Sequence, residues 1–203
     1  MARSKNQTAR REQMVAATIQ IIAEEGLQSV RLSRVAEIVG VSARLVSYYY
    51  ADLESLVEEA HAAAADRYHG SRLRALDHTA EPEEKLVQLI GSGLPGKRDQ
   101  QLSQVLNELG VDASRSQTHA ALMERLFLAE VSLYLGVLQE GAARGAFELA
   151  RPALEVARNL VSLEDAYGTH LLARSSGLDR KAARNAILGF ARVVTGAKLV
   201  KGR

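Results

Sequence analysis

The sequence predicts an all-α protein, and three features of its composition point to that class. Ala, Leu, Arg and Glu, which are strong helix formers, dominate the 203 residues. Proline occurs only three times, and aromatic residues make up 4% of the chain. Few segments alternate β-branched and polar residues with the period of two that marks a strand. Because 47% of the residues are hydrophobic, the chain can bury a real core, in one large domain or in a small domain fused to a larger one.

The first helix is expected to begin near Thr8, and the residues before it are expected to be disordered. Val15, Ile19 and Ile22 recur at spacings of four and three, which places them on one face of a helix. Gly26 is expected to end this helix, because glycine adopts the backbone conformation that commonly follows a helix C-terminus.

Three shorter signals divide the next segment into helices. A second helix ends at Gly40, and Ser42 is a favourable N-cap for a third helix over about residues 43–50. Asp52 is expected to cap a fourth helix. The apolar positions of the second and fourth helices are Leu32, Val35, Ala36 and Val39, and Leu53, Leu56, Val57 and Ala60.

The remaining chain also reads as helices, with no internal repeat. A helix is expected to start at Glu81-Pro82, since proline suits the first helical turn, and to run to about residue 94. Further helices are expected over about residues 100–112, 116–143, 151–174 and 179–198. The sequence thus predicts an N-terminal three-helix domain, residues 1–52, joined by helix four to a C-terminal helical domain, residues 53–203.

The second and third helices form a helix-turn-helix pattern, in which one helix braces another that enters the major groove of DNA. At about 100° per residue, Leu45 and Val46 point toward the core, while Arg44, Ser47 and Tyr48 point away from it. Arg44 suits guanine O6 and N7, and the Tyr48 hydroxyl suits a phosphate. The alternative is a plain helical hairpin within a bundle, because two short helices around a glycine are common.

Residues 26–57 carry a more specific pattern. It comprises a glycine after helix one, the pair Val35-Ala36, then Gly-Val-Ser at 40–42, three tyrosines at 48–50, and an acid-x-Leu at 54–56. This stretch closely resembles the DNA-binding segment of the TetR family of transcriptional regulators. The resemblance implies base contacts from Ala43, Arg44, Ser47 and Tyr48, phosphate contact from Tyr49, a cap at Ser42, and backbone or minor-groove contacts from Arg10 and Arg11.

Three positions depart from the family pattern, and one of them is Ser47, where the family commonly has a tyrosine. Arg31 stands where a Ser or Thr usually caps helix two, and it cannot accept hydrogen bonds from helix N–H groups, although it can reach a phosphate. Leu53 stands where the family usually has a lysine that contacts phosphate.

The C-terminal half resembles the same family less closely. Residues 138–147 and 160–172 are similar to the C-terminal halves of many members, including the BetI-like branch, and this implies a homodimer through the last two helices. An apolar stripe suited to that interface consists of Ala183, Ala186, Ile187, Phe190 and Val194.

The resemblance also implies a small-molecule effector site in this half. A mostly apolar cavity with a few polar groups is what such a site requires. A buried Glu130 would need a partner, either a ligand or Arg125, Arg144 or His170. The alternative is that each polar side chain is satisfied structurally or lies on the surface. The candidate ligand-binding residues are Ile90, Leu106, Leu109, Phe127, Glu130, Tyr134, Asp165 and His170.

Motifs of other functional classes are missing from the sequence. It has no cysteine, no signal peptide and no apolar run of membrane-spanning length, which suits a cytoplasmic, nucleoid-associated protein. The five histidines lack metal-ligand spacing, and there is no nucleophile elbow or P-loop, so we expect no metal, no cofactor and no enzyme activity. The predicted function is a ligand-responsive regulator, a repressor released from a palindromic operator of double-stranded DNA by an effector. The alternative is a helical adaptor whose helix-turn-helix no longer binds DNA.

Overall fold

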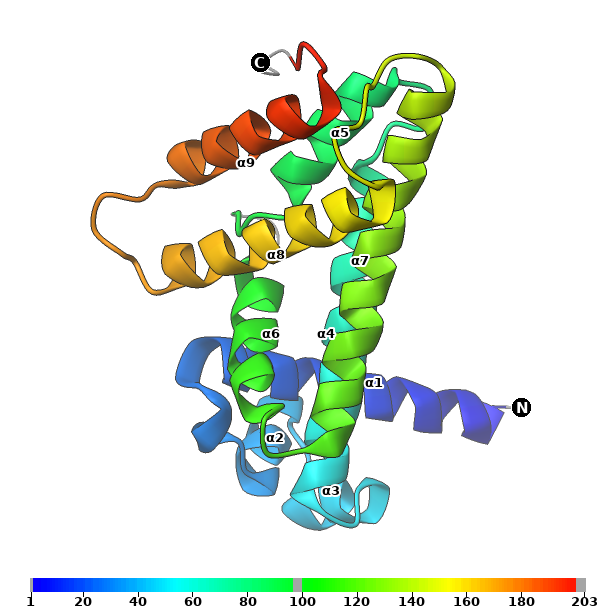
Figure 1. Ribbon diagram of the computed structural model, residues 1–203. Helices are drawn as coiled ribbons and strands as arrows, with labels where there is room; N and C mark the ends of the chain where they lie inside the picture. The colour runs from blue at the N-terminus through cyan, green and yellow to red at the C-terminus, as the bar shows by residue number, and fades with distance from the viewer. Residues whose placement is uncertain (1, 97–99, 200–203) are drawn as a thin grey trace. The chain divides into compact units, whose positions relative to one another are not determined.

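The computed structural model describes residues 2–96 and 100–199, and within these ranges every regular element is a helix (Figure 1). The all-α prediction is therefore confirmed. The helices are α1 (Ala2–Glu25), the 3₁₀ helix η1 (Leu27–Ser29), α2 (Leu32–Val39), α3 (Ala43–Tyr49), α4 (Leu53–Ala75), α5 (Pro82–Ser92), α6 (Gln100–Asp112), α7 (Gln117–Ala143), α8 (Ala153–Leu172) and α9 (Arg180–Thr195).

The chain folds into two compact units. The first unit comprises Met1–Tyr68 and Gln100–Glu124, and the second comprises His69–Asp99 and Arg125–Arg203. Helices α4 and α7 each contribute residues to both units. This division reflects which residues pack against one another. The boundary predicted between residues 52 and 53 instead separates the DNA-binding domain from the effector-binding and dimerisation domain, and it stays a prediction.

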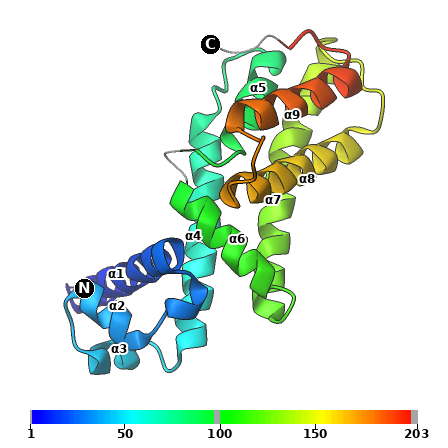
Figure 2. The ribbon, with the colours of Figure 1, turned by 90° about the vertical axis from the view of Figure 1, so that its left-hand side faces the viewer.

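In the first unit, α1 packs against α2 and α6, and α2 packs against α3 (Figures 1 and 2). Val15, Ile19 and Ile22 are buried on α1, as their spacing predicts. The predicted start of this helix at Thr8 is wrong, because α1 begins at Ala2. No glycine or proline interrupts residues 2–25, so each added residue gains a helical hydrogen bond at little cost once the helix has formed.

The residues that end α1 and α2 and the residue that caps α3 are those that the sequence predicts. Gly26 and Gly40 have φ angles of 84° and 71°, which side chains rarely tolerate. The Ser42 Oγ accepts a hydrogen bond from the Leu45 N–H at 3.3 Å. The predicted caps and helix ends are therefore confirmed at both sides of the turn.

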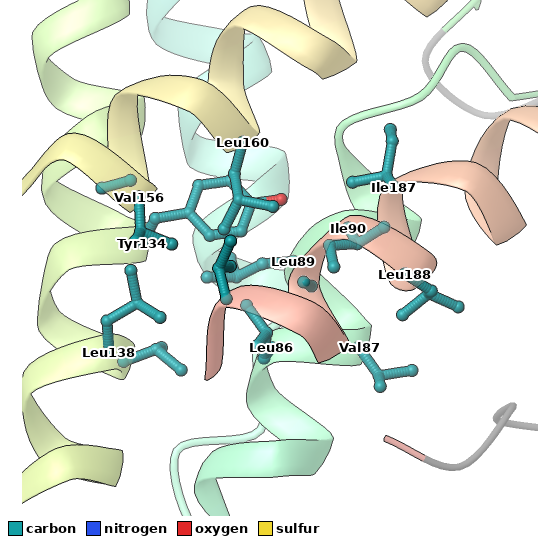
Figure 3. Packing of buried hydrophobic residues seen from close by; sticks show 14 of the residues in the cluster. Leu86, Val87, Leu89, Ile90, Tyr134, Leu138, Val156, Leu160, Ile187 and Leu188 are labelled. Atoms are coloured by element: carbon teal, nitrogen blue, oxygen red, sulfur yellow. The ribbon is translucent and has the colours of Figure 1, made fainter. Parts of the chain in front are cut away.

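The second unit has its core among α5, α7, α8 and α9 (Figure 3). Helix α9 packs against both α8 and α5. Within the apolar stripe that the sequence assigns to a dimer interface, Ala183, Ile187 and Val194 are buried inside the chain itself. The assignment of these three residues to a dimer face is wrong, because their stripe supplies the core of the unit.

The connection between α7 and α8 is bonded to the end of α9. The backbone N–H groups of Glu148 and Ala150 donate to the carbonyls of Thr195 and Val194 at 2.8 and 2.9 Å. Helix α9 ends at Gly196, whose φ of 64° is left-handed, and not near residue 198 as the sequence suggests.

Candidate functional site

Helix α3 presents two chemically different faces. Val46 is fully buried and Leu45 is partly buried, so this side anchors the helix to the first unit. On the other side Ser42, Ala43, Arg44, Ser47 and Tyr48 are exposed. Tyr48 is 72% exposed, which is high for an aromatic side chain. The predicted orientation is confirmed, and the roles of these residues in DNA contact stay predictions.

The three tyrosines at the end of α3 are in different environments. Tyr48 and Tyr49 contact each other edge to face, with ring centroids 5.5 Å apart. Tyr50 is only 2% exposed, and burial raises its pKa to about 12. Tyr50 therefore anchors the C-terminal end of α3, while Tyr48 and Tyr49 keep the orientation that contact with DNA would need.

The two arginines on α1 differ in how strongly the fold holds them. Arg11 forms an ion pair with Glu59 of α4 at 2.5 Å, and its guanidinium lies 4.8 Å from the Tyr50 ring centroid. Arg10 donates to the Gln13 side chain of the next helical turn at 3.0 Å. A DNA phosphate that binds Arg11 would therefore have to compete with the carboxylate of Glu59. Arg10 contacts no carboxylate among the described residues, so a phosphate would meet no such competition there.

The arginines around α2 also have internal partners. Arg31 makes no capping bond to α2, and it donates to the carbonyls of Gln28 and Val30, both at 2.7 Å. Arg34 forms ion pairs with Glu25 and with Glu37, which lies one turn further along α2. Arg44 of α3 forms no ion pair with any described residue, so its charge faces solvent at the position predicted to read bases.

The predicted effector residues fall into three groups. Leu106 and Leu109 are buried in the first unit, on α6. Asp165 and His170 lie on the exposed side of α8, where His170 approaches the Ser175 hydroxyl at 3.4 Å. The third group shares the second unit with Asp165 and His170 but lies in its interior, and it consists of buried Ile90, Glu130 and Tyr134 with half-buried Phe127.

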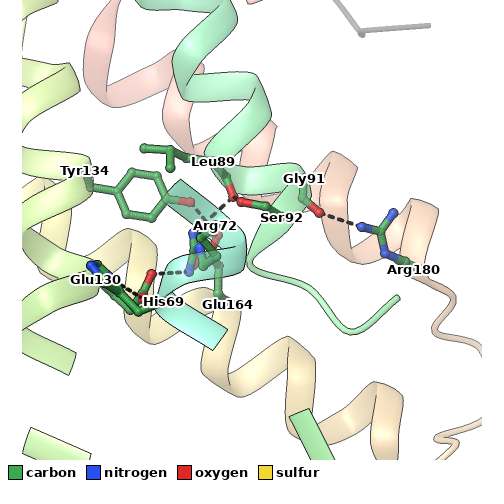
Figure 4. A network of polar contacts seen from close by, with 9 residues as sticks. All are labelled: His69, Arg72, Leu89, Gly91, Ser92, Glu130, Tyr134, Glu164 and Arg180. Atoms are coloured by element: carbon green, nitrogen blue, oxygen red, sulfur yellow. Dashed lines mark hydrogen bonds and ion pairs between the residues drawn. The ribbon is translucent and has the colours of Figure 1, made fainter. Parts of the chain in front are cut away.

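Glu130 and Tyr134 belong to a buried polar cluster that also contains His69, Arg72 and Glu164 (Figure 4). We call these five residues the Arg72 cluster. Arg72 donates to both carboxylate oxygens of Glu164, at 2.9 and 3.1 Å. It also donates to the Leu89 carbonyl of α5 at 3.1 Å.

The other carboxylate of the cluster is held from two sides. Glu130 Oε2 lies 2.9 Å from Arg72 Nη1, and Glu130 Oε1 lies 2.8 Å from His69 Nδ1. Of the partners that the sequence suggests, Arg144 instead pairs with Glu81 and Glu140 at the other end of α7. The suggested partners Arg144 and His170 are thus wrong, because the side chain of Glu130 points toward α4.

Protonation in the cluster follows from burial. Burial raises the pKa of Glu164 to about 7, although Arg72 opposes this shift. Burial also raises the pKa of Tyr134 well above its ordinary value, so its phenol stays neutral. The Tyr134 hydroxyl therefore donates to Glu164 Oε1.

Sequence reasoning missed His69, Arg72 and Glu164, although two of them carried a usable signal. Arg72 continues a series on α4, spaced by four residues, that includes buried Leu56, Ala60 and Ala64. Glu164 similarly follows buried Leu160 on α8. A charged residue that continues an apolar stripe is expected to be buried and paired.

Two other kinds of site are not found in the part of the chain that the structure describes. No three His, Cys, Asp or Glu side chains gather there in a way that would hold a metal ion. None of the helices in the same residues combines the length and apolar character needed to span a bilayer.

Comparison with known proteins identifies similar solved structures but no similar sequence family. The sequence matches no protein-family model and no curated protein. Among solved structures, a protein from Rhodococcus sp. assigned to the TetR family of transcriptional regulators is 23% identical, with a TM-score of 0.80 over 92% of this chain and 98% of its own. A TetR transcription regulator from Haloarcula marismortui is 21% identical, with a TM-score of 0.83 over 93% and 99% of the two chains.

A third similar structure contains a small molecule. It is a protein from Saccharomonospora viridis, assigned as a transcriptional regulator and solved in complex with choline. It is 20% identical, with a TM-score of 0.83 over 91% of this chain and 96% of its own. These likenesses span nearly the whole of each chain, and the chain therefore has the fold of the TetR family of transcriptional regulators.

Proposed function

We propose that the protein is a DNA-binding transcriptional regulator that binds a palindromic operator as a homodimer and responds to a small-molecule effector. The observation that carries this proposal is the solvent-facing side of α3. A capped helix with exposed Ser47, largely exposed Tyr48 and an Arg44 that has no ion-pair partner among the described residues offers base-edge and phosphate contacts along one face.

The alternative is a helical adaptor that has lost DNA binding. Internal pairing of Arg11 and Arg34 reduces the free positive charge of the first unit, which weakens the argument from charge alone. Arg44 supports the regulator instead, because an adaptor has no need of an arginine beside exposed Ser47 and Tyr48 that forms no ion pair within the described part of the chain.

A dimer that reads two half-sites needs its two copies of α3 about one DNA turn apart, roughly 34–36 Å. The dimer is proposed to form through α8 and α9. The solvent-facing side of α9 supports this proposal. One stripe along this side consists of small or apolar residues, which permit close approach of a second helix, while charged Arg180 and Lys181 are exposed at the start of α9. The stripe comprises Ala182, Ala186, Gly189 and Val193. Val193 is 78% exposed within one chain.

The effector is proposed to bind in the second unit and to release the repressor from its operator. Glu130 and Tyr134 are the two predicted effector residues that belong to the Arg72 cluster. The choline complex of a protein with this fold illustrates that such a bundle holds small organic molecules. Release requires that the effector bind the two states of the protein with different affinity. We place the protein in the cytoplasm, where its DNA target lies, and we assign it no cofactor.

Selection of random duplex DNA by the purified full-length protein, at two salt concentrations, tests the proposal. A regulator enriches a palindrome whose half-sites lie one turn apart, and the enrichment weakens as salt rises because phosphate contacts release counterions. Failure to enrich any sequence at either salt concentration would favour the adaptor.

A further inference from the structure

Helix α3 is short, and few of its own contacts fix its direction. Val46 is the one residue of Ala43–Tyr49 that is buried. The N-terminal end is held by Ser42, whose Oγ accepts from the Leu45 N–H at 3.3 Å. Isolated helices of this length are marginal in water, so contacts from outside the helix must determine where its C-terminal end points.

Tyr50 supplies such a contact, because it lies in the corner between α3 and α4. Its N–H donates to the Val46 carbonyl at 2.9 Å, and its backbone is extended, with φ of −131° and ψ of 116°. Two residues later Asp52 caps α4 by accepting from the Ser55 N–H at 2.7 Å. The Tyr50 side chain is buried, so its ring connects the C-terminal end of α3 to the interior of the first unit.

Arg11 of α1 and Glu59 of α4 meet at this ring. Arg11 Nη2 and Nε donate to Glu59 Oε2 and Oε1 at 2.5 and 3.5 Å, so one edge of the guanidinium faces the carboxylate. The centre of the guanidinium lies 4.8 Å from the Tyr50 ring centroid, within the range of a cation–π contact. We call Arg11, Tyr50 and Glu59 the Tyr50 clamp.

The ring, and not the hydroxyl, is the part of Tyr50 that the clamp holds. The hydroxyl is buried and makes no hydrogen bond with the described residues. Burial raises the pKa of Tyr50 to about 12, and the hydrogen bond from Glu59 raises the pKa of Arg11. The clamp therefore keeps a neutral phenol and a charged guanidinium at the pH of any DNA-binding measurement.

The same geometry argues against a phosphate contact from Arg11. A phosphate pairs best with two parallel N–H groups of a guanidinium, and Glu59 already accepts from one such edge. The negative charge of Glu59 would also repel the phosphate. An exposed ion pair contributes little to stability by itself, and these side chains are 46% and 37% exposed. The buried ring that the pair holds gives it a better explanation.

We propose that Arg11 and Glu59 are positioning residues, which act on DNA recognition through the Tyr50 ring, and that Arg11 makes no phosphate contact. This inference rests on the proposed function, because it states how α3 is held for DNA binding. The pair fixes the ring, and the ring fixes the C-terminal end of α3. Base contact from Tyr48, two residues before the ring, depends on that direction.

Removal of Glu59 separates the two roles of Arg11 by the sign of the effect. Affinities of the full-length protein for its selected palindrome and for a scrambled duplex of equal length are measured by fluorescence anisotropy. Glu59→Ala should lower the ratio of the two affinities about fivefold or more, as loss of a base contact does. If Arg11 instead contacted phosphate, loss of the competing carboxylate would free it, and both duplexes would bind more tightly with an unchanged ratio.

The salt dependence of binding gives a second, independent readout. Arg11→Ala should lower the affinity ratio as Glu59→Ala does and leave the slope of log affinity against log salt unchanged. Arg10→Ala is the matched comparison on α1, because Arg10 contacts the Gln13 side chain and no carboxylate of the described residues. Loss of a phosphate contact there should weaken both duplexes alike and lower the slope by about 1.

Two substitutions of Tyr50 test whether the ring carries the effect. Tyr50→Phe keeps the ring and should retain the affinity ratio, whereas Tyr50→Leu should lower it as Arg11→Ala does. Ile187→Val is the control for lost stability, because Ile187 is buried in the core of the second unit. It should leave the ratio unchanged. Urea unfolding of each variant identifies the conditions in which all of them are folded.

The outcomes distinguish this inference from the proposed function. An unchanged ratio in Glu59→Ala, a lowered salt slope in Arg11→Ala, or a lowered ratio in Tyr50→Phe would each overturn the clamp while the protein still selects a palindrome. A wild-type protein that selects no duplex would overturn the proposed function and the clamp together.

Discussion

The carboxylate of Glu164 lies directly against the backbone of Gly93. A Cβ atom at position 93 would be 2.0 Å from the carboxyl carbon of Glu164, a distance that no side chain can accommodate. The glycine at the C-terminal end of α5 therefore creates the space in which the carboxylate meets Arg72. Its backbone is right-handed, with φ of −79°, so space and not conformation requires the glycine.

Gly93→Ala should consequently destabilise the protein by about 3 kcal/mol, because Glu164 must move and leave Arg72 buried without its bidentate partner. The free energy of unfolding in urea measures this. Gly136→Ala is the matched control, since nothing lies within 4 Å of a Cβ at that exposed position in α7. It should stabilise by roughly 0.5–1 kcal/mol, and equal effects of the two changes would contradict the steric argument.

The raised pKa of Glu164 makes stability depend on pH. Between the ordinary pKa of 4.5 and the folded value of about 7, the folded state retains a proton that the unfolded state releases. Its stabilising contribution is full below pH 4.5 and is lost as the pH rises through 7. Wild type should therefore lose up to roughly 3 kcal/mol relative to Glu164→Gln between pH 5 and pH 8. Urea titrations at the two pH values test this, and parallel pH profiles of the two proteins would refute it.

Arg44→Ala should weaken operator binding by about 10- to 100-fold and relax base preference at one position in each half-site. The physical reason is the loss of a bidentate contact from an exposed guanidinium that has no ion-pair partner among the described residues. Arg34→Ala serves as the control, because Arg34 already pairs with Glu25 and Glu37. Affinities are measured by titration of the selected duplex. Unchanged affinity and preference in Arg44→Ala would remove this residue from the interface.

Val193→Lys should convert the proposed dimer into a monomer, because a charged side chain on the exposed face of α9 would be buried without a partner in the proposed interface. Sedimentation equilibrium measures the mass. Val111→Lys is a suitable control, since Val111 is 73% exposed and lies on α6. If Val193→Lys keeps the mass of the parent protein, either the dimer forms through another surface or the chain is monomeric.

Local patterns predict α2 and α3 well because their determinants lie close together in the sequence. The cap at Ser42, the left-handed Gly40 and the division of α3 into two faces each depend on a few neighbouring residues. The Arg72 cluster could not be predicted from such local patterns. Its partners are separated by 92 residues in one pair and 61 in another, and only tertiary packing brings them together.

The predicted effector site stays a prediction, although the positions of its residues can be compared with the structure. The period of α7 correctly puts Glu130 and Tyr134 on one face, but family analogy placed Leu106 with them although it packs in the other unit. The assignment of Ala183, Ile187 and Val194 to a dimer face was wrong because apolar periodicity identifies a buried face without telling whether a partner chain or the same chain buries it.

The two backbone hydrogen bonds from Glu148 and Ala150 to the end of α9 have a consequence for dynamics. In hydrogen–deuterium exchange, a surface connection usually loses its amide protons quickly. Here the amides at positions 148 and 150 should exchange slowly and at the rate of the last turn of α9, because both open only when that turn unwinds. The connection between α7 and α8 thus behaves as part of a helical turn that lies more than forty residues further along the chain.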